Sequence, residues 1–160
     1  MELVPYANEH LWLTEALETD TGVMAELGGA WPRDEIPSIH ERRLKSIAAG
    51  TWLFTIVPEA GASPVGLIGI FDSDLDGSPI SEMFWLILPA HQGRGYGSSA
   101  LRMLLDRVQA DGRWGPIHAF SGVTNAPSNA LCRKSGFVLV GEREIDYGGR
   151  TLRCNHWIRE

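Results

Sequence analysis

Residues 88–98 read LPAHQGRGYGS, and this stretch decides the expected fold. It places three alternating glycines between an apolar run at residues 80–88 and a series of leucines at helical spacing from residue 101. Glycine lets a backbone approach a ligand closely and adopt dihedral angles that other residues avoid. Unpaired N–H groups and the dipole at a helix N-terminus attract anions. We therefore expect a strand–loop–helix unit whose loop binds a phosphate or pyrophosphate, with Arg94 adding charge-assisted contacts.

Two other glycine-rich phosphate loops fit this stretch poorly. A P-loop requires a lysine after its last glycine, whereas Gly97 is followed by Ser98 and Ser99. The dinucleotide-binding fingerprint requires a glycine where Ser98 stands, and it lies near the start of a βαβ unit rather than after a hairpin. A tight turn without a ligand is the remaining alternative, and the basic residue and the helix start argue against it.

The spacing of apolar residues changes once along the chain. About the first 50 residues show helical spacing, with Asn8 as the expected cap of a helix that carries Leu11, Trp12 and Ala16 on one side. Residues 51–57 and 65–71 then predict a β-hairpin. The remaining expected elements are strands at 80–88, 117–120, 137–140 and 152–158 and helices after Gly97 and at 125–135. This order predicts one mixed α/β domain over residues 1–160, with a partly parallel sheet.

Composition excludes several classes of partner. The formal net charge of −6 argues against non-specific nucleic-acid binding, which needs a basic surface, and it suits a cationic partner. No apolar run approaches the roughly 20 residues that span a bilayer, and residues 1–5 lack the features of a secretory signal. Cys132 and Cys154 are too few for a metal-binding pattern, so we expect no metal and a reducing cytoplasmic environment.

Two motifs carry a resemblance to a known family. Gln92 to Gly97 follow the order Gln-x-x-Gly-x-Gly, which resembles the acetyl-CoA pyrophosphate loop of the GNAT family of N-acetyltransferases. Residues 125–137, NAPSNALCRKSGF, resemble the family's Asn-x-x-Ser…Lys-x-Gly-Phe segment beside the pantetheine arm of the cofactor. The N-terminal half resembles more loosely the subgroup of ribosomal-protein and spermidine acetyltransferases. The resemblance implies a central mixed sheet of about six to seven strands, flanked by helices, with two splayed central strands.

The resemblance also implies where acetyl-CoA binds. In this family the free backbone groups of the splayed strand bond the pantetheine arm, the glycine loop holds the pyrophosphate, and the asparagine of the second motif contacts the cofactor while capping its helix. Carried onto this chain, the cofactor-binding residues are Trp85, Leu86, Ile87, Leu88, Gln92, Gly93, Arg94, Gly95, Tyr96, Gly97, Ser98 and Asn125.

Three residues are candidates for proton transfer. Glu82 begins the central strand, where many family members carry the carboxylate that accepts the proton of the amine; a solvated strand-end glutamate is the alternative. Cys132 stands where many relatives place a tyrosine acid, although a small core residue is its other interpretation. Ser128, one helical turn earlier, resembles the serine proposed for the ribosomal-protein subgroup, and we favour it as the acid. The reaction can also proceed without an acid, by proximity and polarisation of the carbonyl.

The expected activity is the transfer of an acetyl group from acetyl-CoA to a primary amine by direct attack in a ternary complex. The acceptor is either a protein N-terminus or a small-molecule amine, and neither nucleic acid nor a membrane is an expected partner. A homodimer stays open as an alternative to a monomer. The competing function is a non-catalytic sensor that binds acyl-CoA, in which Glu82 and Ser128 would have no role.

Overall fold

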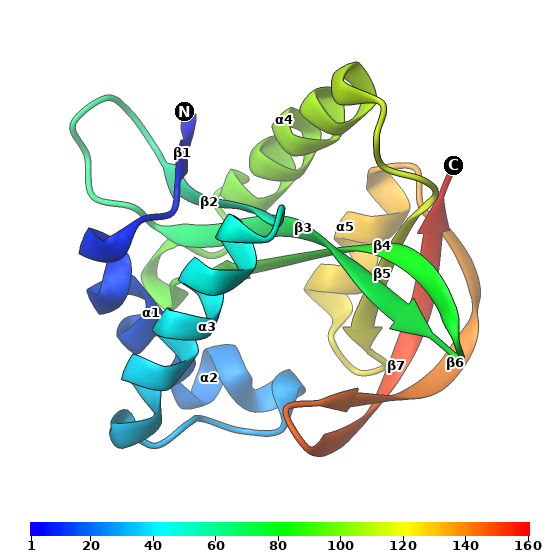
Figure 1. The fold of residues 1–160 in the computed structure, drawn as a ribbon, viewed down its shortest axis with the longest axis horizontal. Helices are drawn as coiled ribbons and strands as arrows, with labels where there is room; N and C mark the ends of the chain where they lie inside the picture. The colour runs from blue at the N-terminus through cyan, green and yellow to red at the C-terminus, as the bar shows by residue number, and fades with distance from the viewer.

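The computed structural model describes all residues 1–160, which form one mixed sheet of seven strands in the order β1-β2-β3-β4-β5-β7-β6 (Figure 1). Neighbouring strands are antiparallel except β4 and β5, which are parallel. The fold class expected from the sequence is therefore confirmed. The strands are β1 (Glu2–Pro5), β2 (Trp52–Val57), β3 (Gly66–Leu75), β4 (Ser78–Ile87), β5 (Ile117–Gly122), β6 (Val138–Tyr147) and β7 (Arg150–Arg159).

Helices cover both faces of the sheet (Figure 1). Alternate residues of each strand point to opposite faces, and each face has its own hydrophobic cluster. One cluster joins Leu13 and Leu17 to Leu53, Leu67 and Leu86 of the sheet. The other joins the two later helices to the opposite face. The first face carries α1 (Leu11–Glu18), α2 (Thr21–Met24) and α3 (Ile36–Ala48), and the second carries α4 (Tyr96–Asp111) and α5 (Ala126–Lys134).

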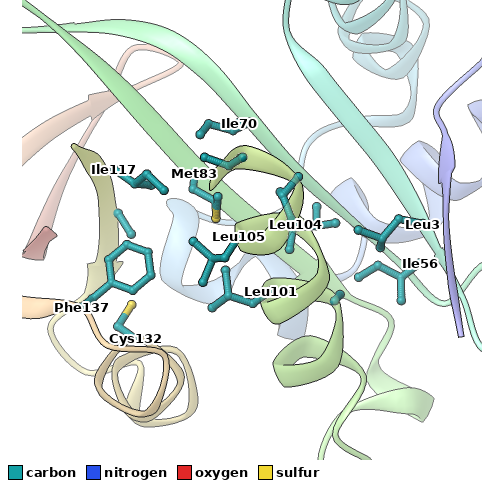
Figure 2. Packing of buried hydrophobic residues seen from close by; sticks show 14 of the residues in the cluster. Leu3, Ile56, Ile70, Met83, Leu101, Leu104, Leu105, Ile117, Cys132 and Phe137 are labelled. Carbon is teal, nitrogen blue, oxygen red and sulfur yellow. The ribbon is translucent and has the colours of Figure 1, made fainter. Parts of the chain in front are cut away.

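The leucines of α4 pack into the larger cluster. Leu101, Leu104 and Leu105 lie against Met83 of β4 and Ile117 of β5, as Figure 2 shows. Their three- and four-residue spacing is the helical period that the sequence displayed. This packing fixes the start of α4 at the end of β4, where the glycine loop lies. None of the helices is both long and apolar enough to cross a membrane.

Three expectations for the N-terminal segment were wrong. The first residues form β1, which pairs with β2 over Glu2↔Val57 to Pro5↔Phe54, rather than a helix. Leu11 and Trp12 are exposed, whereas Leu13, Thr14, Leu17 and Glu18 are the buried residues of α1. Asn8 does not cap α1, because its side chain is hydrogen-bonded to His40 instead.

The parallel strands β4 and β5 separate soon after they meet. They are paired only at Ser81↔Ile117 and Glu82↔His118. The N–H of Leu88 donates to the Val65 carbonyl oxygen at 2.8 Å, so alternation along the strand directs the backbone groups of Leu86 and Leu88 toward the β3 side. The backbone groups of Trp85 and Ile87 therefore face the gap that opens beside β5, and the expected splayed strands are confirmed.

Candidate active site

The glycine loop forms a row of free backbone donors at the start of α4. Gly93 and Gly95 have φ angles of 72° and 83°, a region that L-residues with side chains rarely adopt. The first N–H of this helix with a backbone acceptor is that of Ser99, which donates to the Gly95 carbonyl oxygen at 3.0 Å. The N–H groups of residues 93–98 have no backbone acceptor, and a Cβ built on Gly93 or Gly95 would enter open space. The loop can therefore accept an anion at close range.

Gln92 connects this loop to the splayed strand. Its Nε2 donates to the Ile87 carbonyl oxygen at 3.0 Å. That oxygen faces the gap, so the bond replaces one that β5 would make in an unbroken sheet. Gln92 thus fixes the loop against the end of β4, while the neighbouring Arg94 is exposed. Gln92, the first residue of the motif, therefore holds the loop in place, whereas Arg94, the third, is exposed to solvent.

A cleft of about 1200 Å³ runs along the splayed strands. It joins the glycine loop to the α1–α3 side of the sheet, and most of the candidate residues line it. Leu88, Arg94 and Cys132 are not part of its lining. The candidate residues that do line the cleft are Glu82, Trp85, Leu86, Ile87, Gln92, Gly93, Gly95, Tyr96, Gly97, Ser98, Asn125 and Ser128.

Ser128 is held at the gap by contacts from two elements. The side chain of Asn125 caps α5 by accepting a hydrogen bond from the Ser128 N–H at 3.2 Å. The Trp85 indole Nε1 donates to the Ser128 Oγ at 3.3 Å. Because the hydroxyl oxygen accepts from the indole, its own proton stays available to a group in the cleft.

Cys132 lies in the hydrophobic core rather than in the cleft. Its side chain is 0% exposed and packs beside Phe137, as Figure 2 shows. Burial raises the pKa of the Cys132 thiol to about 12, although a hydrogen bond with Ser121 opposes the shift. The thiol therefore stays protonated at neutral pH and has no direct path to a bound ligand.

Glu82 lies on the opposite side of the sheet from Ser128. Its side chain shares a face with Phe71, its cross-strand partner on β3, and is half-buried. Burial raises the pKa of the Glu82 carboxyl, and a hydrogen bond with Ser73 opposes this rise. A carboxylate with a raised pKa, at the last pair before the strands separate, can accept a proton from a group in the gap.

The far wall of the cleft comes from residues that sequence reasoning missed. Glu18 and Glu26 reach it from the N-terminal helical region, Phe120 from β5 and Tyr147 from the end of β6. Glu18 alone had a signal in the sequence, since it continues the buried stripe of α1 as a charged residue. The others are polar or aromatic residues in ordinary positions of helices and strands.

A second, smaller hollow of about 370 Å³ lies beside the loop. Ser98 lines both this hollow and the cleft, so the two are contiguous. Arg102, Lys134 and Arg159 also line it and make it basic. Elsewhere, no group of three or more His, Cys, Asp or Glu side chains is placed to hold a metal ion.

Comparison with known families agrees with this geometry. The model of the acetyltransferase (GNAT) domain matches residues 1–138 of the chain. The chain therefore belongs to the GNAT acetyltransferase family and is an acetyltransferase. No curated protein matches its sequence.

Solved structures share the fold at low sequence identity. A ribosomal-protein-alanine N-acetyltransferase from Brucella melitensis superposes with a TM-score of 0.80 at 19% identity, over 99% of both chains. A spermidine N-acetyltransferase from Vibrio cholerae, solved with CoA and spermine, superposes with a TM-score of 0.79 at 18% identity, over 99% of this chain and 94% of the other. At such identities the likeness establishes the fold and leaves the acceptor open.

Proposed function

We propose that this chain transfers the acetyl group of acetyl-CoA to a primary amine by direct attack in a ternary complex. The observation that carries the proposal is the cleft through the splayed strands, which joins an anion-binding loop on one side to a carboxylate of raised pKa on the other. A thioester and an amine that enter from opposite sides would meet in this gap. Holding two reactants together in this way can supply a large part of the rate enhancement.

The residues present fit acetyl-CoA, which supplies the activated acetyl group and a thiolate leaving group when bound. The free N–H groups of residues 93–98 would hold its pyrophosphate. The backbone groups of Trp85 and the N–H of Ile87 would bond its pantetheine arm, because they face the gap, whereas the Ile87 carbonyl oxygen already accepts from Gln92. Leu86 and Leu88 direct their backbone groups toward β3, so we assign the arm to the other two residues.

Glu82 would act as the base. An amine is mostly protonated near neutral pH and must lose a proton to become a nucleophile. The raised pKa of Glu82 makes its carboxylate a better proton acceptor than an ordinary glutamate. Its place at the last β4–β5 pair puts this acceptor at the mouth of the gap.

Ser128 would protonate or stabilise the leaving thiolate. Its hydroxyl proton is free while its oxygen accepts from Trp85, and it lines the cleft on the α5 side. Cys132, the other candidate acid, is enclosed in the core. We therefore propose Ser128 for this role and a structural role for Cys132.

The charges of the cleft favour an amine acceptor. Its lining contains seven carboxylates but only three arginines, an excess of four negative charges. Such a field attracts a protonated amine. The acceptor is a peptide α-amino group or a small-molecule amine; the Brucella protein is named for a ribosomal-protein alanine and the Vibrio protein for spermidine. Both cysteines are free thiols, which suits a reducing cytoplasm.

A thiol-release assay with acetyl-CoA and a panel of peptides and small amines tests this function. We expect CoA release that depends on the amine and formation of the acetylated amine by mass spectrometry. A non-catalytic sensor gives a different result, because it binds acetyl-CoA without acetylating any amine in the panel. That outcome would overturn the proposed acetyltransferase activity in favour of a non-catalytic acyl-CoA sensor.

The small basic hollow would hold the 3′-phosphate of the cofactor. Arg102→Gln should weaken acetyl-CoA binding about 10-fold, the effect of losing one hydrogen bond to a charged group. The same variant should bind acetyl-dephospho-CoA as the unmodified protein does. Arg107→Gln is the matched control, since Arg107 lies on the same helix outside the hollow. Calorimetric titration of both ligands measures the difference, and an equal loss for both would exclude this placement.

A further inference from the structure

Glu18 is a buried carboxylate on the acceptor side of the cleft. It is the last residue of α1, and its side chain is only 2% exposed. It lines the same cleft as Glu82, but it comes from the helical face rather than from the sheet. A charged side chain at such a position is rare unless a partner compensates for its lost hydration.

The partner of Glu18 is Arg43, which contacts only one of the two carboxylate oxygens. Arg43 of α3 forms an ion pair with the Glu18 Oε1 through its Nη2. The Nη1 of Arg43 donates to the Thr14 Oγ1 at 2.9 Å, and this hydroxyl in turn bonds the Tyr6 hydroxyl at 2.5 Å. Arg43 is therefore fixed by its own neighbours. The Glu18 Oε2 is buried and has no hydrogen-bond partner.

An ion pair that only held α1 and α3 together would commonly use both carboxylate oxygens. Arginine and carboxylate commonly pair through two parallel hydrogen bonds. A buried polar atom without a partner costs about 1–3 kcal/mol, more when it is charged. Proteins keep few such atoms, and each one calls for a specific explanation. A ligand group that completes the pair is an explanation that also accounts for the place of Glu18 in the cleft.

Tyr147 belongs to the same part of the cleft. It ends β6, more than a hundred residues away in sequence, and lines the cleft with Glu18. Burial and the negative charge of Glu18 raise the pKa of Tyr147 to about 12, while Arg43, Arg150 and Arg42 oppose the rise. The phenol therefore stays protonated, and its hydroxyl adds a second polar group to this end of the cleft.

We infer that Glu18 determines acceptor specificity, because its unpartnered Oε2 accepts a hydrogen bond from a second polar group of the acceptor. The inference rests on the proposed function, in which the reacting amine faces Glu82. The ligand class is an amine that carries a further hydrogen-bond donor, either an ammonium or a hydroxyl group. A simple alkylamine lacks this donor and leaves the Oε2 unsatisfied.

Matched probes test the inference on the full-length protein saturated with CoA, which cannot react. Calorimetry compares alkylamines with amino alcohols and α,ω-diamines of two to six carbons, so that the required spacing is found rather than assumed. At the best length, the probe with a second donor should bind about 10-fold more tightly than the alkylamine. The amino alcohol and diamine arms distinguish a neutral donor from a cationic one.

Variants distinguish a role of Glu18 in recognising the acceptor from a structural role in joining α1 to α3. Glu18→Gln replaces a carboxylate, whose two oxygens both accept hydrogen bonds, with an amide that has one donor and one acceptor. The preference for the probe with a second donor over the alkylamine should then fall to within about twofold. Glu15→Gln makes the same change at a more exposed position of the same helix. Thr14→Val removes a hydrogen bond of Arg43 at a residue that is not itself part of the cleft lining. Both should keep the preference, and thermal unfolding reports any loss of stability separately.

The outcomes differ for the two hypotheses. Equal binding of paired probes, or a preference that survives Glu18→Gln, would overturn the role of Glu18 and leave the amine acceptor standing. If Thr14→Val also abolishes the preference for a second donor, Glu18 has the structural role of joining α1 to α3 instead of a role in recognition. Failure of every amine to bind the CoA-saturated protein would overturn both the proposed acceptor class and this inference.

Discussion

Replacing Gly95 with valine should weaken acetyl-CoA binding about 100-fold, equivalent to losing one or two hydrogen bonds to a charged group. Gly95 has a φ of 83°, which a β-branched residue avoids, and it precedes the first residue of α4. A valine there would shift the N–H groups that face the anion and place methyl groups between them and the pyrophosphate. Fluorescence or calorimetric titration with acetyl-CoA measures the loss.

Gly61 supplies a matched control for the backbone strain that valine would cause at a positive φ. It has a φ of 79° with open space around the position of a Cβ, and it lies in the loop between β2 and β3, away from the cleft. Gly61→Val should therefore carry a similar backbone penalty and bind acetyl-CoA normally. Tyr96→Phe should also have little effect, because the backbone of the loop supplies the binding groups. Unchanged affinity in Gly95→Val would show that the pyrophosphate binds elsewhere.

Glu82→Gln should lower kcat/KM about 100-fold at neutral pH, the typical contribution of a general base. Because burial raises the pKa of Glu82, its carboxylate form is present above that raised pKa and is lost as the pH falls through it. The unmodified enzyme should therefore show an inflection at this raised pKa that the variant lacks, while protonation of the free amine affects both enzymes. The deficit should be greatest between this raised pKa and the optimum. It should shrink below the pKa, where the unmodified enzyme also loses its base, and at high pH, where the amine is already neutral in solution. Full pH–rate profiles measure both features.

Asp72→Asn is the control for this experiment. Asp72 lies on the neighbouring strand β3, pairs with Ser81, and is an exposed residue outside the cleft lining. Removing its charge changes the net charge of the chain as Glu82→Gln does, without removing the proposed base. A pH–rate profile of Glu82→Gln that keeps the inflection at the raised pKa would exclude Glu82 from proton transfer.

Local features of this protein were readable from the sequence. The strand–loop–helix unit around residues 88–98 depends on neighbours within a few positions, because glycine dihedrals and helix starts are set by local geometry. The cap of α5 by Asn125 is likewise a contact across three residues. The spacing of the leucines on α4 identified its buried face for the same reason.

Features that depend on distant segments were not readable in this way. Residues 2–5 became β1 because β2, some fifty positions later, supplies its hydrogen-bond partners. Nothing within β4 or β5 alone shows that their pairing ends at Glu82↔His118, since the pairing of two strands is a contact between distant segments of the chain. The choice between Ser128 and Cys132 also depended on packing, because one lines the cleft and the other points into the core.

The acceptor end of the site shows most clearly which features depend on local sequence and which depend on the tertiary structure. The sequence by itself determined the family motifs and the loop for the cofactor, because both are continuous segments of chain. Only the tertiary structure brought Glu18 of α1 and Tyr147 of β6 to one wall of the cleft and left the Glu18 Oε2 without a partner. Burial and hydrogen-bond satisfaction are properties of the folded environment, so no local pattern of residues specifies them.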